Sequence, residues 1–189
     1  MLKFPSQTVT QRGFSMLETL IALVVFSVGL LGTAALQTVS KKATYDSVQR
    51  TTAAMLASDL LERMRANPTV LDDYLGVLTV MPTAMPATDC AAVQCDPDEI
   101  ATYDLWSFGR LLSGAAETTG TASSGGLMDP TLCVAGPADG SAGFYEVAVA
   151  WRGRSNLPNR SAHLCGTGRY GTEEAERRLL TFLTFLDTR

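Results

Sequence analysis

The sequence is short of the residues that most catalytic and metal sites need. It holds one histidine, His163, so a site that requires two imidazoles, such as the HExxH pattern of metalloproteases, cannot form. Charged residues make up only 18% of the 189 residues, and the formal net charge is -4. This charge gives no support for a nucleic-acid partner, and we expect neither an enzyme nor a bound cofactor or metal.

Charge is absent altogether between Glu18 and Lys41. As an α-helix, residues 19–40 would span about 33 Å, which is enough to cross a hydrocarbon core about 30 Å thick. The preceding residues carry Lys3 and Arg12 and no acid, a composition typical of a cytoplasmic side. We therefore expect a single membrane-spanning helix with its N-terminus in the cytoplasm.

A cleaved secretory signal is the alternative for this segment, with Thr33-Ala34-Ala35 as its cleavage site. The apolar core of such signals has about 7–15 residues, which is shorter than the run seen here. Glu18 also favours a retained helix, because an acid in an apolar membrane segment costs about 2.5–3.5 kcal/mol at mid-membrane and needs a partner. A cut between Gly13 and Phe14 would place Glu18 in the first turns of the helix, where the helix dipole and a new amine favour an anion.

The stretch Gly13-Phe14-Ser15-Met16-Leu17-Glu18, followed directly by the uncharged run, resembles the class III signal of type IV pilins and type II secretion pseudopilins. The resemblance implies that a prepilin peptidase cuts after Gly13 and that the new amine of Phe14 is methylated. It also implies that Glu18 pairs with the terminal amine of a neighbouring subunit. The helix would stay in the inner membrane until the subunit enters a filament.

Helical periodicity continues beyond the apolar run. Apolar residues recur at helical spacing on one side, with polar residues on the other; the apolar set is Ala53, Leu56, Ala57, Leu60, Leu61 and Met64. Pro68 disfavours helical backbone at the residue before it, so we expect one helix from Phe14 to Ala66.

The end of this helix, Leu61-Glu62-Arg63-Met64-Arg65-Ala66-Asn67-Pro68, together with the apolar stretch 20–32, resembles the minor pilin family named type IV pilus modification, or PilV. This resemblance implies a structural subunit of the pilus priming or tip complex that promotes pilus assembly, adhesion and twitching motility. Its partners would be other minor pilins, the major pilin and the inner-membrane assembly machinery. A type II secretion pseudopilin and a secreted binding domain remain the alternatives.

The remaining residues predict a small α+β domain. Residues 68–95 indicate a surface connection and 113–126 a loop. A capping pattern, Asp96-Pro97-Asp98-Glu99, starts a helix with a buried stripe of Ala101, Leu105, Phe108 and Leu112. Strands are predicted at 131–135, 144–152 and 177–186, although the last also has helix propensity; in the second, the packed face is Tyr145, Val147, Val149 and Trp151.

The fold class expected from these elements is α+β and pilin-like, with a long N-terminal helix packed on a small antiparallel sheet. The predicted divisions are a leader at 1–13, a transmembrane or filament-core helix at 14–40, its amphipathic second half at 41–67, and a periplasmic domain at 68–189.

All four cysteines, Cys90, Cys95, Cys133 and Cys165, lie in the second half. They lack the two close pairs typical of a zinc site, and an exported domain would oxidise them to disulfides. Of the three possible pairings, we expect Cys90–Cys95, which closes a short loop before the capped helix, and Cys133–Cys165, which ties one strand to the loop after the next strand.

Four other features of the sequence are candidate sites. The G-x-G-x-x-G match at 166–171 lacks the βαβ context of a dinucleotide site and predicts a hairpin loop. His163 beside Ser161 or Cys165 lacks a nucleophile motif and predicts an ordinary loop. Tyr103 and Trp106 predict core packing rather than ligand stacking. A basic run without acids is either a docking patch or a set of solvated loop residues; it comprises Arg152, Arg154, Arg160 and Arg169.

Overall fold

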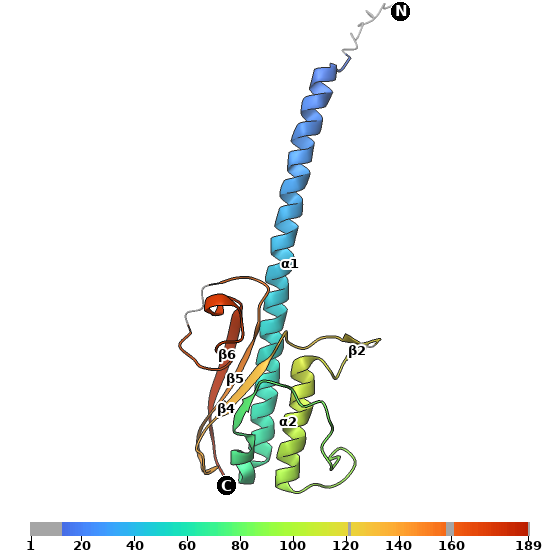
Figure 1. Ribbon diagram of the computed structural model, residues 1–189. Coiled ribbons are helices and arrows are strands. Elements are labelled where there is room, and N and C mark those ends of the chain that lie inside the picture. The colour runs from blue at the N-terminus through green and yellow to red at the C-terminus, as the bar shows by residue number, and fades with distance from the viewer. Residues whose placement is uncertain (1–12, 121, 158–160, 189) are drawn as a thin grey trace, which may run out of the picture. The chain divides into compact units, whose positions relative to one another are not determined.

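A computed structural model of the protein describes residues 13–120, 122–157 and 161–188. The chain divides into two compact units, Met1–Lys41 and Lys42–Arg189, and helix α1 (Met16–Ala66) contributes residues to both. Figure 1 shows the elements in chain order. The core and the sheet belong to the second unit, whereas the described part of the first unit is almost entirely helix.

Helix α1 ends where the sequence predicts and begins two residues later. Ser15 lies just outside the helix, and its Oγ accepts a hydrogen bond from the backbone N–H of Leu17 at 3.3 Å, as N-cap serines do. The C-terminal boundary at Ala66 is confirmed, and Asn67 is buried. The predicted apolar stripe is also confirmed: five of its members are buried and Leu56 is half-buried.

Helix α2 (Pro97–Ser113) has the predicted capping box, in which the Asp96 backbone N–H donates to Glu99 Oε2 at 3.1 Å. It stops at Gly114, whose φ of 73° is left-handed backbone that glycine adopts without strain. Of the predicted stripe, Leu105 is only half-buried but packs against the main core, as the three buried members do. Trp106 is buried outside that cluster, with its ring near Tyr103 and under the Arg110 guanidinium.

A four-stranded antiparallel sheet has the order β1-β4-β5-β6, which confirms the predicted α+β class. Its strands are β1 (Gly76–Leu78), β4 (Thr131–Ala135), β5 (Gly143–Arg152) and β6 (Arg177–Leu186). The strand alternative for 177–186 is therefore confirmed. In register, Phe144 lies opposite Phe185 and Cys133 opposite Ala148.

Two segments predicted as irregular contain structure. The connection 68–95 holds the 3-10 helix η1 (Pro68–Tyr74) and strand β1, and Leu71 and Tyr74 are buried, so it is not only a surface connection. The loop 113–126 holds the short strands β2 (Thr118–Thr119) and β3 (Ala122–Ser123). The three strands among these elements have only two or three residues each, which is too short to show a period in the sequence.

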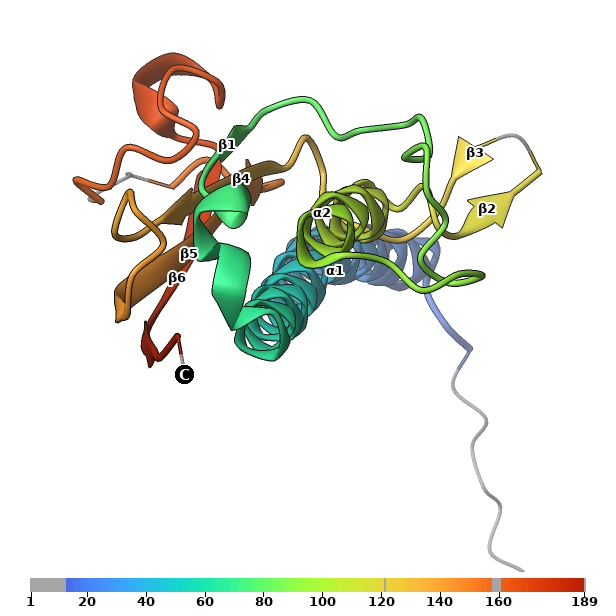
Figure 2. The ribbon, with the colours of Figure 1, turned by 90° about the horizontal axis from the view of Figure 1, so that it is seen from below.

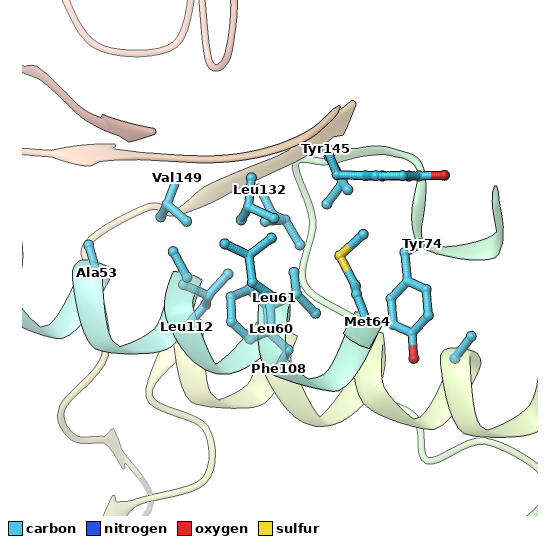
Figure 3. Close-up of a cluster of buried hydrophobic side chains, with 14 of the residues drawn as sticks. Ala53, Leu60, Leu61, Met64, Tyr74, Phe108, Leu112, Leu132, Tyr145 and Val149 are labelled. Atoms are coloured by element: carbon cyan, nitrogen blue, oxygen red, sulfur yellow. The ribbon is translucent and has the colours of Figure 1, made fainter. Parts of the chain in front are cut away.

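The main core lies between one face of the sheet and the two helices, which lie on the same side of it (Figure 2). Figure 3 shows Leu60, Leu61 and Met64 of α1 meeting Leu132 and Tyr145 of the sheet. All four predicted packed-face residues of β5 are buried, but Ala148 and Ala150 on its other face are buried as well, so the prediction of a single packed face is wrong for this part of the strand.

Both predicted disulfides are present. Cys90 pairs with Cys95, and Cys133 of β4 pairs with Cys165. Cys165 lies in the connection that joins β5 to β6, which also carries the G-x-G-x-x-G segment. That segment is therefore part of a hairpin connection, as expected, and does not follow a strand into a helix as a dinucleotide site would.

Candidate functional site

The helical segment of the first unit exposes its apolar side chains. Every described residue from 13 to 41 is exposed, with Phe14 at 83% and Met16 at 90%. The apolar window of α1 has a mean hydropathy of 2.3 and none of it is buried, and by length and composition it can cross a membrane. Such a surface requires lipid or apolar protein around it.

Hydroxyl groups within this segment bond to their own helix. Thr19 Oγ1 donates to the carbonyl of Met16 at 2.9 Å, and Ser27 Oγ donates to that of Val24 at 2.8 Å. Thr33 and Thr38 make the same kind of bond. These polar groups therefore need no partner from outside the helix.

Glu18 differs from these hydroxyls. It lies in the first turn of α1, is exposed, and makes no hydrogen bond or ion pair within residues 13–120, 122–157 and 161–188. Its carboxylate is the only charged side chain in the helix before Lys41. An acid in this place gains from the positive end of the helix dipole and from any amine brought to it.

The predicted processing residues lie just before the helix. Gly13 and Phe14 are both exposed and precede Met16, so neither is held in regular structure. A Cβ added at Gly13 would meet no atom within 4 Å. The peptide bond between Gly13 and Phe14 is thus open to an enzyme that approaches it.

In the second unit, Gln49 ties α1 to the segment before β4. Its Nε2 donates to the Gly126 carbonyl at 2.9 Å, and its Oε1 accepts from the Met128 N–H at 3.2 Å. Gln49 is buried and lies four residues before Ala53 on the apolar stripe. The sequence analysis missed it, although a polar residue in register with a buried stripe was the available signal.

A second polar cluster lies between α1, η1 and α2. Asp104 accepts from Arg63 Nη1 and from the Tyr74 hydroxyl, both at 2.8 Å, and Arg63 Nε donates to Asp59 at 2.9 Å. Burial raises the pKa of Tyr74, and the hydrogen bond to Asp104 adds to that shift. Asn67 Nδ2 donates to the Pro97 carbonyl at 2.7 Å. The cluster holds the end of α1 against α2.

The described members of the basic run have partners within the fold. Arg152 pairs with Asp129 and Glu176, and Arg169 pairs with Asp129, each at 3.0 Å. The Arg154 guanidinium lies over the ring of Tyr45 at 4.2 Å from its centroid. Arg160 lies outside the described residues. Arg152 and Arg169 are therefore engaged in ion pairs within the fold rather than freely solvated.

His163 has a structural position. Its ring contacts Glu146 Oε1 through Nε2 at 2.5 Å, and its Nδ1 accepts from the Cys165 backbone N–H at 3.0 Å. Cys165 is disulfide-bonded and offers no thiolate. Within the described part of the chain, no group of three or more His, Cys, Asp or Glu residues is placed to hold a metal ion.

Comparison with known families gives two adjacent matches. The prokaryotic N-terminal methylation motif matches residues 9–34, and the Tt1218-like family, described as type IV pilin Tt1218, matches residues 35–106. Neither match names the type IV pilus modification family. Comparisons with curated proteins and with solved structures gave no match.

Together, the two matches support a type IV pilin, a structural subunit rather than an enzyme. The methylation motif implies processing by a prepilin peptidase and assembly with other pilins. The exposed apolar helix fits membrane anchoring before assembly and incorporation into a pilus afterwards.

Proposed function

We propose that this protein is a minor type IV pilin of the type IV pilus modification kind. It acts as a structural subunit of the priming or tip complex, where it promotes pilus assembly and, through the pilus, adhesion and twitching motility. The methylation motif, the exposed apolar helix and the sequence at the end of α1 support this proposal.

Processing comes first in the proposed function. The prepilin peptidase removes residues 1–13 by cutting after Gly13, and the amine of Phe14 is then methylated. Residues 14–40 hold the subunit in the inner membrane as a single span with its N-terminal side in the cytoplasm, and residues 68–189 form the periplasmic domain. The exposure of Gly13 and Phe14 supports a cut at this bond.

Glu18 is the observation that carries the proposal. It is an exposed carboxylate next to an uncharged stretch of α1 and has no partner within the described residues. In the filament, the proposed partner is the N-terminal amine of a neighbouring subunit. A charge-assisted pair of this kind is worth about 1.5–3 kcal/mol, and more where water is excluded.

The experiment replaces Glu18 by Gln, which keeps the shape of the side chain and removes its charge. We expect Glu18→Gln protein to be cleaved and membrane-bound but reduced at least about tenfold in sheared pili, as the loss of one such pair predicts. Immunoblots of membrane and pilus fractions measure the ratio.

Glu62→Gln is the matched control, because Glu62 is an exposed acid of the same helix. It should enter pili like the unaltered protein. Normal incorporation of the Glu18→Gln protein would contradict the assembly role. A deletion strain that keeps its pili and loses protein secretion would instead support a type II secretion pseudopilin.

A further inference from the structure

The outer face of the sheet, turned away from α1, is covered over only half its length. Cys165 and Tyr170, from the connection between β5 and β6, are buried against Ala148 and Ala150 of β5. The Tyr170 hydroxyl hydrogen-bonds with Thr131 Oγ1 at 2.8 Å. This half of the face is closed by the protein's own chain.

The cover is firmly held. The Arg177 guanidinium is buried and donates to the backbone carbonyls of Ser161, His163 and Cys165, at 3.0, 2.7 and 3.1 Å from the nearest nitrogen. The Cys133–Cys165 disulfide fixes the same connection to β4. The connection is thus tied in place over Ala148 and Ala150 and does not reach across the rest of the face.

The other half of the face carries three large apolar side chains that are exposed to solvent. Phe144 is 66% exposed, Leu183 65% and Phe185 54%. Phe144 lies opposite Phe185 in register, with an edge-to-face ring contact of 5.6 Å, and Leu183 lies two residues along β6 on the same face. They form one contiguous group, which we call the outer apolar patch.

This patch borders an open sheet edge. Strand β6 is the last strand in the order, and among the described strands it pairs only with β5. Apart from the β5 ladder, no backbone hydrogen bond of residues 179–186 is made to any described part of the chain. The edge strand has ten residues, against three for β1 at the opposite edge.

The β6 edge lacks the features that prevent pairing with other chains. Its two charged residues, Arg177 and Arg178, stand at its start, residues 179–186 include no proline and no charged side chain, and the register with β5 continues without a bulge from Arg177 to Leu186. Such an edge is a template for another strand, because its outward N–H and C=O groups are already aligned. An extended backbone is the partner that satisfies this row of donors and acceptors.

We propose that the β6 edge receives an extended strand of another polypeptide with apolar residues at alternate positions. The strand adds to the sheet beside β6 and places every second side chain against the outer apolar patch. The backbone ladder supplies affinity, and the side chains at Phe144, Leu183 and Phe185 select an alternating apolar sequence.

The size of the surface indicates what kind of partner it suits. Three half-exposed large side chains and a strand edge offer on the order of 400–500 Å² per partner, below the roughly 800 Å² of a standard stable interface. A free dimer of two copies would therefore be weak. The surface suits a strand that is brought close by other contacts, where a small added interface is effective.

Hydrogen exchange of the full-length protein in detergent micelles tests this proposal. The probe is a capped peptide of sequence Lys-Thr-Val-Thr-Phe-Thr-Val-Lys. The outward N–H groups of β6 make no hydrogen bonds and therefore exchange fast. Strand addition should slow amide exchange in residues 179–186 at least threefold and leave the exchange rates of β1 unchanged. The control probes are two versions of the same peptide, each N-methylated on the alternate amides that point to one of its two edges. The version that is methylated on the edge facing β6 cannot form the backbone ladder, so at least one of the two should give no protection.

Leu183→Lys should weaken protection by the peptide, and Val77→Lys, at an equally exposed position of β1, should not. Phe144→Lys, on β5, repeats the test away from β6 itself. Equal protection by all the N-methylated peptides would show apolar adsorption and overturn the proposal, as would unchanged binding to both lysine variants of the patch. Protection of β6 that rises with protein concentration alone would identify a second copy as the occupant and would also overturn it.

Discussion

At the scale of single residues, Glu18 of α1 and Asp104 of α2 show two ways in which a helix carries an acid among apolar residues. Glu18 has no partner within the described residues, whereas Asp104 is bonded to Arg63 and Tyr74. The sequence singled out Glu18 because a local motif surrounds it. Asp104 went unnoticed because its partners lie 41 and 30 residues away and are brought to it only by the fold.

Removal of the Asp104 carboxylate tests the residue-scale account. In Asp104→Ala, the Arg63 guanidinium keeps only its bond to Asp59, and the Tyr74 hydroxyl loses its buried acceptor. We expect a loss of about 2–3 kcal/mol in the free energy of unfolding, since hydrogen bonds to charged groups are worth about 1.5–3 kcal/mol. Urea unfolding of the full chain in mild detergent measures it.

Arg65→Ala is the control for this variant, because Arg65 pairs with Glu62 and donates to Thr184 Oγ1 of β6 at 2.8 Å, and both contacts lie on the exposed side of the helix. Exposed pairs contribute about 0–1 kcal/mol, so its effect should be small. Equal losses in the two variants would show that the buried cluster has no special part in joining α1 to α2.

At the scale of elements, the helices and the long strands could be predicted because each is marked by residues within or next to it. The capping box and Gly114 bound α2, Pro68 follows the end of α1, and alternation marks β5. Strand β1 and the β2–β3 pair could not be predicted in this way, because strands of two or three residues have no readable period. Strand β1 exists through its pairing with β4, which is a contact distant in sequence.

The two disulfides allow a prediction at this scale. Cys133–Cys165 closes a separation of 32 residues and Cys90–Cys95 one of 5. Loop-closure entropy assigns them about 3–4 and about 2 kcal/mol respectively. The double variant Cys133→Ala with Cys165→Ala should therefore unfold at lower urea than Cys90→Ala with Cys95→Ala. The reverse order would mean that local packing around the short loop outweighs chain entropy.

At the scale of the whole molecule, the two units are suited to different surroundings. Residues 42–189 have a buried core that joins both helices to the sheet, while the described residues before 42 bury nothing. Length and hydropathy account for the exposure of the described residues before 42, since an uncharged helical run has no polar face for water. The processing residues were likewise predicted from a local motif, and Gly13, Phe14 and Glu18 stay predictions until the mature protein is examined.

Intact-mass spectrometry of the mature protein, with sequencing of its N-terminal peptide, tests the central claim most directly. The account predicts a chain that begins at Phe14, carries an N-methyl group and retains α1. Loss of Lys3 and Arg12 would change the formal side-chain charge from -4 to -6. A chain that begins near Leu36, without the apolar helix, would contradict it and indicate a cleaved secretory signal.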